Sequence, residues 1–410
     1  MLGLTLEGGG AKGAYQIGAW KAFREVGMEF NGITGTSVGA LNGGLILQND
    51  FDVAWDLWFN VMPQQVMTLD DDIYVMLSDR KLDHTNIMVL IEEIRRIIKN
   101  AGIDTAPLYN MIHEVMREDV IRKSPMDFGF VTYSITDRKL LELFKEDIPE
   151  GKLADYLMAS SYLPVFKERL LDGKLFLDGS FYNNLPVNML LRKGYKDIYA
   201  VRLYKAGRIN KIDPGETSIH YIVPERELGG ILDFNRERSR HNLKLGYLDT
   251  LRKLKNYKGQ RYYLKDFPDE YDSLQMMLRW PEKARIEICR TLDLKPNKAL
   301  NRLFIEDAVP DLMELAGLND DQSYQDLLLR IIEAIAETCD IDYLKLYTFE
   351  ELVSEVCTCP VHEQKNEAGK MTSLLKKSEI LFRPGREKKK EALLKLFMDN
   401  RDWFTRTGLA

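Results

Sequence analysis

The stretch Gly32-Ile33-Thr34-Gly35-Thr36-Ser37-Val38-Gly39-Ala40-Leu41-Asn42-Gly43-Gly44 decides the fold of this 410-residue chain. It predicts a short buried strand, a tight turn that carries Ser37, and a helix that begins with small residues. Residues 35–39 fit the pattern G-x-S-x-G, in which a strained strand-to-helix turn exposes a serine hydroxyl above a sheet. The flanking glycines remove side chains that would obstruct this turn, and the helix dipole favours negative charge there. A Gly/Ser turn that only caps a helix is the alternative.

A second glycine-rich turn lies upstream, between a predicted strand over Leu2–Leu6 and a predicted helix over Ala14–Val26. Its residues, Glu7-Gly8-Gly9-Gly10-Ala11-Lys12-Gly13, match the dinucleotide pattern G-x-G-x-x-G. A nucleotide site also needs an acidic residue at the end of the next strand, where this chain has residues 35–37, Gly-Thr-Ser. Bare N–H groups at a helix N-terminus can instead stabilise the oxyanion of a tetrahedral intermediate. We expect this loop to lie beside Ser37, with nucleotide binding as the alternative.

Composition narrows the class of protein. Hydrophobic residues make up 45% of the chain and charged residues 29%, which is typical of a globular protein, and the length predicts more than one domain. A net charge of −6 argues against general nucleic-acid binding. Four cysteines are too few for a disulfide framework. Because no signal-peptide pattern and no long apolar run are present, we expect a cytoplasmic protein.

The segment from about residue 50 to residue 126 has a helical pattern without strands and predicts a helical insertion beside the site. Its stretch Ile87–Asn100 is strongly amphipathic. Trp55, Trp58 and Phe59 either pack in the core or line an acyl pocket. The acidic run Asp70–Asp72 is expected to be a solvated turn, with metal binding as the alternative.

Strand patterns resume at Phe128–Ile135 and Leu140–Phe144, and a helix is expected over Leu153–Ser161. Two Asp-Gly pairs follow. Asp172-Gly173 lies between alternating apolar runs, which is the pattern of a hairpin turn. Asp178-Gly179 ends a strand and leads into an irregular Asn/Pro stretch, so its carboxylate would emerge at a strand end, where open α/β sheets place their chemistry. Asp178 is therefore either a partner for Ser37 or a turn residue.

Four motifs taken together resemble the patatin-like phospholipases. They are Gly8–Gly13, Gly35–Gly39, Ala159-Ser160-Ser161-Tyr162-Leu163-Pro164-Val165-Phe166 and Asp178-Gly179-Ser180. The resemblance covers about residues 1–255 and implies an α/β fold of three α/β/α layers around a central, mostly parallel sheet. It also implies hydrolysis of lipid acyl esters by a Ser–Asp dyad without histidine. None of the five histidines follows a late strand in the way that a Ser-His-Asp triad requires.

The roles that the resemblance implies carry over residue by residue. Ser37 is the nucleophile, Asp178 the proton acceptor, and Gly8, Gly9 and Gly10 the oxyanion hole. The supporting residues are Ala11, Lys12, Gly13, Gly35, Gly39 and Gly179. Lys12 stands where the family often has arginine, which keeps the charge but loses a bidentate fork. Ser180 replaces the commoner glycine or alanine, and neither departure breaks the chemistry.

The resemblance implies a lipid or ester substrate, without a cofactor or a metal. Phospholipase A, lysophospholipase and carboxylesterase activities all fit it. A fold that binds or signals without turnover is the alternative from another class, and the intact motifs argue against it.

The remaining strand patterns are Asp197–Leu203 and Ser218–Val223, and the long helix Asn235–Lys258 is expected to pack back on the sheet and close the domain. One more strand is expected within Gly259–Lys265. We therefore expect a hydrolase domain over 1–265 and a helical region over 266–410.

In the C-terminal region, the sequence predicts helices over Leu303–Leu315, Tyr324–Cys339, Phe349–Val356 and Leu393–Phe404. The first of these is expected to be interrupted at Pro310. The run Cys357-Thr358-Cys359-Pro360-Val361-His362 offers only three zinc ligands at cramped spacing, so we expect a loop with idle thiols. Basic residues between Lys376 and Lys390 precede an amphipathic stretch. This stretch either contacts anionic lipid headgroups, as at a peripheral membrane surface, or packs on its own protein.

Overall fold

The computed structural model describes residues 1–68, 102–203, 208–319, 323–359 and 387–405. The chain divides into two compact units, Met1–Lys255 and Asn256–Ala410. The boundary expected from the sequence, at residue 265, lies later because Gly259–Lys265 was expected to add one more strand to the hydrolase domain. Its strand is only β8 (Tyr263–Leu264), which pairs in parallel with β9 (Leu346–Tyr347) inside the second unit.

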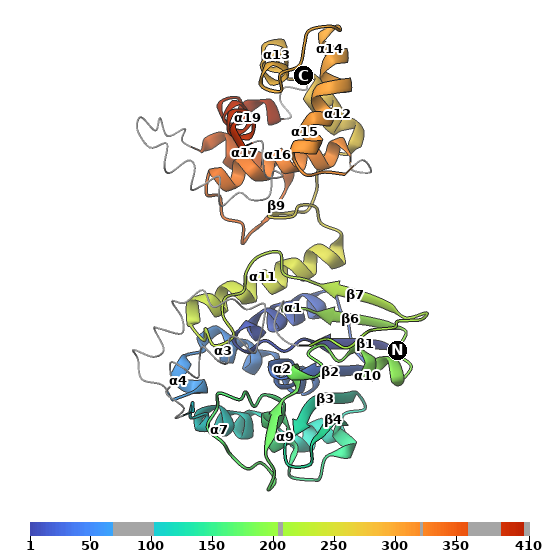
Figure 1. Ribbon diagram of the computed structural model, residues 1–410, viewed down its shortest axis with the longest axis vertical. Coiled ribbons are helices and arrows are strands. Elements are labelled where there is room, and N and C mark those ends of the chain that lie inside the picture. The colour runs from blue at the N-terminus through green and yellow to red at the C-terminus, as the bar shows by residue number, and fades with distance from the viewer. Residues whose placement is uncertain (69–101, 204–207, 320–322, 360–386, 406–410) are drawn as a thin grey trace. The chain divides into compact units, whose positions relative to one another are not determined.

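A mixed, mostly parallel sheet forms the centre of the first unit, with the strand order β4-β3-β2-β1-β6-β7 (Figure 1). All neighbours along this order pair in parallel except β3 and β4, and β5 also pairs antiparallel with β3. The strands are β1 (Leu2–Leu6), β2 (Gly32–Thr36), β3 (Asp127–Ser134), β4 (Lys139–Phe144), β5 (Phe176–Asp178), β6 (Asp197–Val201) and β7 (Ser218–Ile222). The first two strands, β1 and β2, are direct neighbours in this sheet.

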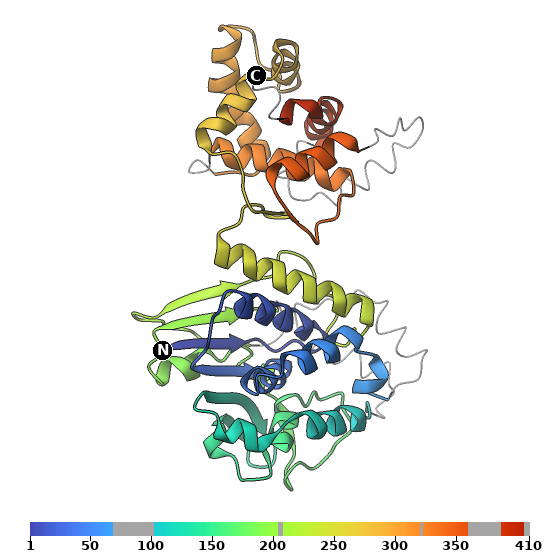
Figure 2. The ribbon, with the colours of Figure 1, turned by 180° about the vertical axis from the view of Figure 1, so that it is seen from behind.

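Helices cover both faces of the sheet, which confirms the three α/β/α layers. Successive strand residues point to opposite faces. A Cβ on Gly43 of α2 (Val38–Leu47) would lie 3.1 Å from Ile33, so α2 covers one face. A Cβ on Gly3 would instead meet Leu190 of α10 (Val187–Arg192) on the other face. The two views show the sheet between these layers (Figures 1 and 2).

The long helix α11 (Arg236–Lys255) packs mainly on α1 (Ala14–Glu25), also contacts β7 at the edge of the sheet, and is the last element of the first unit. The two helices cross at glycines: a Cβ on Gly246 would lie only 1.9 Å from the carbonyl oxygen of Tyr15. The Tyr15 hydroxyl donates a hydrogen bond of 2.9 Å to Asp249 in α11. Small residues at this crossing thus let α1 and α11 approach closely.

The described part of the predicted insertion is helical and consists of α3 (Phe51–Asn60), α4 (Pro63–Val66), α7 (Ala106–Val115) and α8 (Glu118–Lys123). Ile87–Asn100 and Asp70–Asp72 lie outside the described residues. The helix expected over Leu153–Ser161 is α9 (Leu153–Ser160).

The predicted hairpin turn at Asp172-Gly173 is confirmed. Both residues have positive φ, 48° and 72°, as a type I′ turn requires. Leu171 and Lys174 exchange backbone hydrogen bonds of 2.9 and 3.0 Å across it. Asp172 is therefore a turn residue, which distinguishes it from Asp178.

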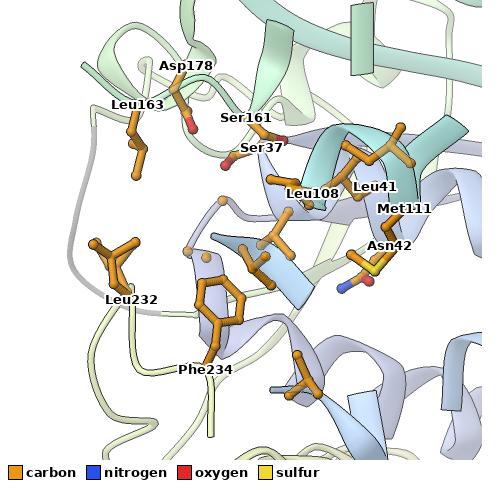
Figure 3. Close-up of a pocket in the computed structure, with 18 of the residues that line it drawn as sticks. Ser37, Leu41, Asn42, Leu108, Met111, Ser161, Leu163, Asp178, Leu232 and Phe234 are labelled. Carbon is orange, nitrogen blue, oxygen red and sulfur yellow. The ribbon is translucent and has the colours of Figure 1, made fainter. Parts of the chain in front are cut away.

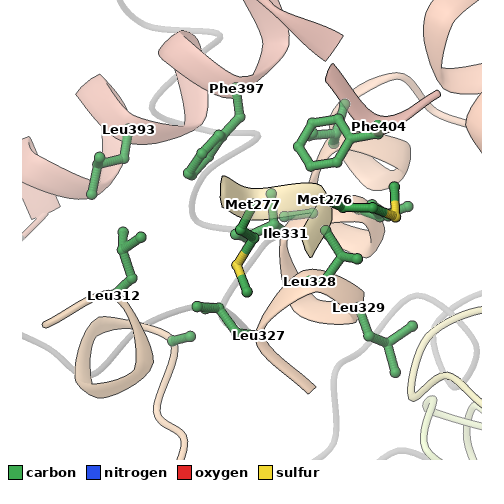
Figure 4. Packing of buried hydrophobic residues seen from close by; sticks show 14 of the residues in the cluster. Met276, Met277, Leu312, Leu327, Leu328, Leu329, Ile331, Leu393, Phe397 and Phe404 are labelled. Carbon is green, nitrogen blue, oxygen red and sulfur yellow. The ribbon is translucent and has the colours of Figure 1, made fainter. Parts of the chain in front are cut away.

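The second unit is helical around an apolar core to which α16 (Tyr324–Thr338) contributes Leu327, Leu328 and Ile331 (Figure 4). Two of its helices were not expected from the sequence, α12 (Glu270–Leu278) and α13 (Glu282–Thr291). The others are α14 (Leu300–Leu303), α15 (Val309–Leu315), α17 (Phe349–Thr358) and α19 (Glu387–Asp399), with a short 3₁₀ turn over Arg401–Phe404.

The interruption expected at Pro310 takes the form of a change in helix type just before the proline. A π-helical turn, Phe304–Ala308, joins α14 to α15, so the chain remains helical through the proline. The wider turn accommodates a residue that has no N–H group and whose ring would clash with the carbonyl four residues earlier.

The expectations for the run Cys357–His362, for the basic residues and for contact with lipid headgroups rest on residues that the structure describes only in part. His362 and the basic residues from Lys376 to Arg386 lie outside the described ranges. Within those ranges, no group of three or more His, Cys, Asp and Glu side chains is placed to hold a metal ion. Lys390 of α19 is buried. No described helix combines the length and the apolar character needed to cross a membrane.

Candidate active site

Ser37 occupies a strained turn between β2 and α2. Its φ of 55° and ψ of −128° are rarely adopted by a residue with a side chain. The surrounding glycines are required by close backbone approach: a Cβ on Gly35 would lie 2.3 Å from the Gly39 carbonyl oxygen. A Cβ on Gly39 would lie 2.3 Å from the Leu6 carbonyl oxygen. The turn that carries Ser37 (the nucleophile elbow) is therefore held by close backbone contacts between the ends of β1 and β2 and the start of α2.

The backbone of Ser37 is held by Ser160, at the end of α9. The Ser37 amide donates a hydrogen bond of 2.9 Å to the Ser160 hydroxyl oxygen, and that hydroxyl donates one of 2.7 Å to the carbonyl of Val131 in β3. Ser160 is fully buried. The third motif of the sequence thus supplies an anchor for the strained turn, a role that sequence reasoning did not assign.

Asp178 ends β5, which is antiparallel to β3 and pairs Asp178 with Thr132. In the sequence, Asp178 is a candidate because open α/β sheets place their chemistry at the carboxyl ends of parallel strands. That reason does not apply, because β5 runs opposite to the strands whose carboxyl ends form the site. The residue still comes close to Ser37 because the next residue, Gly179, packs against β3. A Cβ there would lie 2.2 Å from the Val131 carbonyl oxygen.

The carboxylate of Asp178 is almost completely removed from solvent, with 1% of the residue exposed. Its Oδ1 accepts a hydrogen bond of 2.8 Å from the Ser180 amide, and Oδ2 has no hydrogen-bond partner among the described residues. Burial raises the pKa of Asp178 to about 6, opposed in part by Ser180 and by the Ser37 hydroxyl. Figure 3 shows the Asp178 and Ser37 oxygens directed toward each other at one end of a pocket.

The glycine loop lies beside this pair, and its amides differ in availability. The Gly8 amide donates to the Asn184 carbonyl at 3.1 Å, and the Ala11 amide to the Ile231 carbonyl at 2.8 Å. Gly9 and Gly10 enter the 3₁₀ helix Gly10–Gly13, and their amides have no acceptor among the described residues. Two of the three glycines that the sequence nominates therefore have free N–H groups, and Gly8 does not.

The pocket in front of these groups has a volume of about 120 Å³ and an almost entirely apolar wall. Helices α2, α3, α4 and α7 form much of this wall, and the glycine loop and the segments that follow α9 and precede α11 also contribute to it (Figure 3). Its apolar side chains are Val38, Leu41, Leu45, Leu57, Trp58, Val61, Val66, Leu108, Met111, Ile112, Val115, Met116, Leu163, Phe166, Ile231, Leu232 and Phe234.

The structure brings the predicted nucleophile, proton acceptor and oxyanion-hole glycines to this pocket. Ser37, Asp178 and residues 8–10 line it, while the supporting residues Ala11, Lys12, Gly13, Gly35, Gly39 and Gly179 surround it without lining it. Of the predicted aromatic cluster, only Trp58 reaches the wall. No lysine, arginine or histidine is among the described residues of the lining. A nucleotide phosphate would find no cation there.

Sequence reasoning missed several polar residues that surround the glycine loop. The Asn184 side-chain amide donates to the Gly8 carbonyl at 3.2 Å, so this residue contacts Gly8 on both backbone groups. Gln16 and Asn42 are buried beside the same loop. Asn42 is the one amide within the small and apolar start of α2, which is a signal that could have drawn attention to it.

Comparison with known proteins is consistent with this geometry. Residues 4–191 match the family model for patatin-like phospholipases. Relatives include the patatin-like phospholipase domain-containing protein ZK370.4 of Caenorhabditis elegans, 25% identical over 70% of this chain and 21% of that protein. Lysophospholipase NTE1 of Kluyveromyces lactis is 28% identical over 49% of this chain and 12% of that protein. The chain thus spans a small part of the length of these relatives.

Two further likenesses extend the comparison. The patatin-like phospholipase domain-containing protein 7 of Rattus norvegicus is 25% identical over 49% of this chain and 13% of that protein. Among solved structures, VipD from Legionella pneumophila superposes with a TM-score of 0.33 at 14% identity, covering 98% of this chain and 91% of that one. The family match spans the glycine loop, the serine turn and the Asp178 segment, so residues 4–191 of this chain are similar to the patatin-like phospholipases.

Proposed function

We propose that this protein hydrolyses acyl esters of lipids, with Ser37 as the nucleophile and Asp178 as the proton acceptor. The observation that carries the proposal is the meeting of these two side chains at the end of an apolar pocket, beside two free backbone amides. An apolar wall suits an acyl chain, while the few polar groups at its end suit the ester. The similarity of residues 4–191 to the patatin-like phospholipases supports the same class of substrate.

In the proposed reaction, Ser37 Oγ attacks the ester carbonyl carbon while its proton passes to Asp178 Oδ2. This oxygen has no other hydrogen-bond partner among the described residues and can receive the proton. The tetrahedral intermediate then expels the alcohol, which takes the proton from Asp178, and an acyl-enzyme remains. Water repeats the two steps and releases the fatty acid.

A carboxylate is ordinarily too weak a base to take a proton from serine, and burial reduces this mismatch. The pKa of about 6 makes Asp178 a stronger base than an exposed aspartate, while the group remains ionised at neutral pH. The negative charge that develops on the ester oxygen needs donors in place before the reaction. The amides of Gly9 and Gly10 are assigned this role, and the amide of Gly8 is not, because it already donates to Asn184.

The experiment combines covalent labelling with turnover. A fluorophosphonate probe should add to Ser37 in the wild type, located by peptide mass spectrometry, and Ser37→Ala should abolish both labelling and hydrolysis. Asp178→Asn should abolish hydrolysis while the protein stays folded. Ser134→Ala is a matched control, because Ser134 donates to Asp137 at 2.8 Å and does not line the pocket. It should label and turn over like the wild type.

A panel of phospholipids, lysophospholipids and p-nitrophenyl esters assigns the substrate within this class. Folded wild-type protein that neither labels nor cleaves any of these esters would support the alternative of a binding module without turnover.

A further inference from the structure

A chain of buried side-chain amides connects the glycine loop with the wall of the pocket. Gln16 Nε2 donates to the Glu7 carbonyl oxygen at 2.7 Å. Asn42 Nδ2 donates to Gln16 Oε1 at 2.8 Å and to the Gly13 carbonyl oxygen at 3.0 Å. The indole N–H of Trp58 donates to Asn42 Oδ1 at 2.9 Å. Gln16 and Asn42 are each 1% exposed.

The indole of Trp58 sets the direction of every hydrogen bond in this series of buried amides. Because Trp58 can only donate, the atom of Asn42 that faces it must be the oxygen, and the Asn42 NH₂ group must face the helix α1 side. There it finds two acceptors, the Gly13 carbonyl and Gln16 Oε1. With its oxygen occupied, Gln16 presents its own NH₂ group to the Glu7 carbonyl. Each amide therefore has one orientation that satisfies all its neighbours.

The two carbonyls that these amides hold are the two ends of the glycine loop. Glu7 directly precedes Gly8, and Gly13 ends the 3₁₀ turn that begins at Gly10. Asn42 belongs to α2, the helix whose N-terminal cap is Ser37. The hydrogen bonds thus tie the loop that carries the free amides to the element that carries the hydroxyl.

We infer that Gln16 and Asn42 are positioning residues, which hold the amides of Gly9 and Gly10 at the place where the ester oxygen becomes charged. This inference rests on the proposed function, since it assigns a purpose to the loop only if Ser37 attacks an ester. Neither residue contacts the reacting atoms in this role. A displacement of donors by about 1 Å lowers turnover by about a hundredfold in enzymes of this kind, so small errors in the loop matter.

The test uses Gln16→Met, which keeps the length of the side chain and removes its amide. Turnover of a p-nitrophenyl ester should fall about tenfold to a hundredfold, with KM within about threefold of the wild type. Inhibition by a trifluoromethyl ketone, which forms a tetrahedral adduct with serine, should weaken by the same factor as kcat/KM. A purely structural role of Gln16 would lower the melting temperature without this parallel change.

Thr5→Val provides the matched control. The Thr5 hydroxyl shares a buried hydrogen bond of 3.0 Å with Thr34 inside the sheet, away from the pocket lining. Its loss removes a buried hydrogen bond from the strand that precedes the loop, and turnover should stay within about twofold of the wild type. Circular dichroism and thermal unfolding give the folded fraction by which each rate is normalised.

If Gln16→Met does not fold, a variant that disturbs the packing less can test the same role. Trp58→Phe retains a ring in the wall and removes only the N–H group that orients Asn42, and it should weaken the ketone about threefold to tenfold. Unchanged turnover and unchanged ketone inhibition in these variants overturn the positioning role alone. Wild-type protein that does not label at Ser37 and cleaves no ester overturns the proposed function, and the positioning role with it.

Discussion

The amide of Ser37 and the hydroxyl of Ser160 form a hydrogen bond of 2.9 Å between residues 123 positions apart. This bond satisfies the backbone of the residue whose conformation is the most strained in the site. It also occupies the Ser37 amide, so this N–H group is not available to an oxyanion. The Ser160 hydroxyl also donates a hydrogen bond to the Val131 carbonyl of β3, so the turn is fixed to the sheet.

Ser160→Ala should lower both stability and turnover. The Ser37 amide would lose its acceptor in a fully buried position, which costs about 1–3 kcal/mol, and the nucleophile would be held less firmly. Chemical denaturation gives the stability change, and ester hydrolysis gives kcat. Ser161→Ala is the neighbouring control for stability, because the Ser161 hydroxyl makes only a long hydrogen bond of 3.4 Å to Leu157. Equal stability of the two variants would contradict the anchoring role of Ser160.

The activity should depend on the ionisation of Asp178. With a pKa of about 6, the carboxylate is protonated in acid and cannot accept the Ser37 proton. We expect kcat/KM to fall tenfold per pH unit well below this value and to reach a plateau above it. A rate profile on a p-nitrophenyl ester, corrected for the substrate's own hydrolysis, measures this. A profile that stays flat down to pH 4 would exclude Asp178 as the base.

The same pKa predicts that Asp178 destabilises the fold at neutral pH. Its pKa rises from 3.8 to about 6 on folding, so the native state binds a proton between these values that the unfolded chain has lost. Stability therefore falls as pH rises through this window, by about 2–3 kcal/mol in total. Asp178→Asn should exceed the wild type in stability at pH 7.5 and match it near pH 3.5. Asp119→Asn, at an exposed ion pair with Lys123, should shift the unfolding midpoint little at either pH.

The elbow glycine Gly39 should tolerate no side chain. Alanine there would place a Cβ 2.3 Å from a strand carbonyl oxygen, and we expect a loss of more than about 3 kcal/mol or failure to fold. Gly43→Ala is the control in the same helix, because its Cβ would meet only side chains, at 3.1 Å. Urea unfolding compares the two. A mild effect at Gly39 would show that the turn can open without cost.

In the second unit, Glu333 should act as a buried acceptor for backbone groups. Its Oε1 accepts from the amides of Gln260, Arg261 and Tyr262 at 2.7 to 3.0 Å, and burial raises its pKa. Glu333→Leu would leave these N–H groups unpaired and should cost about 3 kcal/mol or more. Glu333→Gln keeps one acceptor oxygen and should be much milder. Thermal unfolding of the full chain separates these outcomes, and equal losses would contradict this role.

The sequence by itself determined the elements and the two turns of the site. Periodicity and glycine spacing identified the strand ends at Leu6 and Thr36 and the serine between them, because these signals are local. The same local signals distinguished Asp172, in a hairpin with positive φ, from Asp178. Local patterns indicated an interruption at Pro310 but not its form, a π-helical turn that keeps the chain helical.

Only the tertiary structure decided which groups meet and which of them are free. The antiparallel direction of β5, the anchoring of Ser37 by Ser160 and the occupation of the Gly8 amide by Asn184 all depend on contacts between distant segments. The basicity of Asp178 likewise comes from burial, which no residue pattern specifies. A sequence records which donors and acceptors a chain has, whereas their pairing and their exposure to water are set when the sheet and its helices come together.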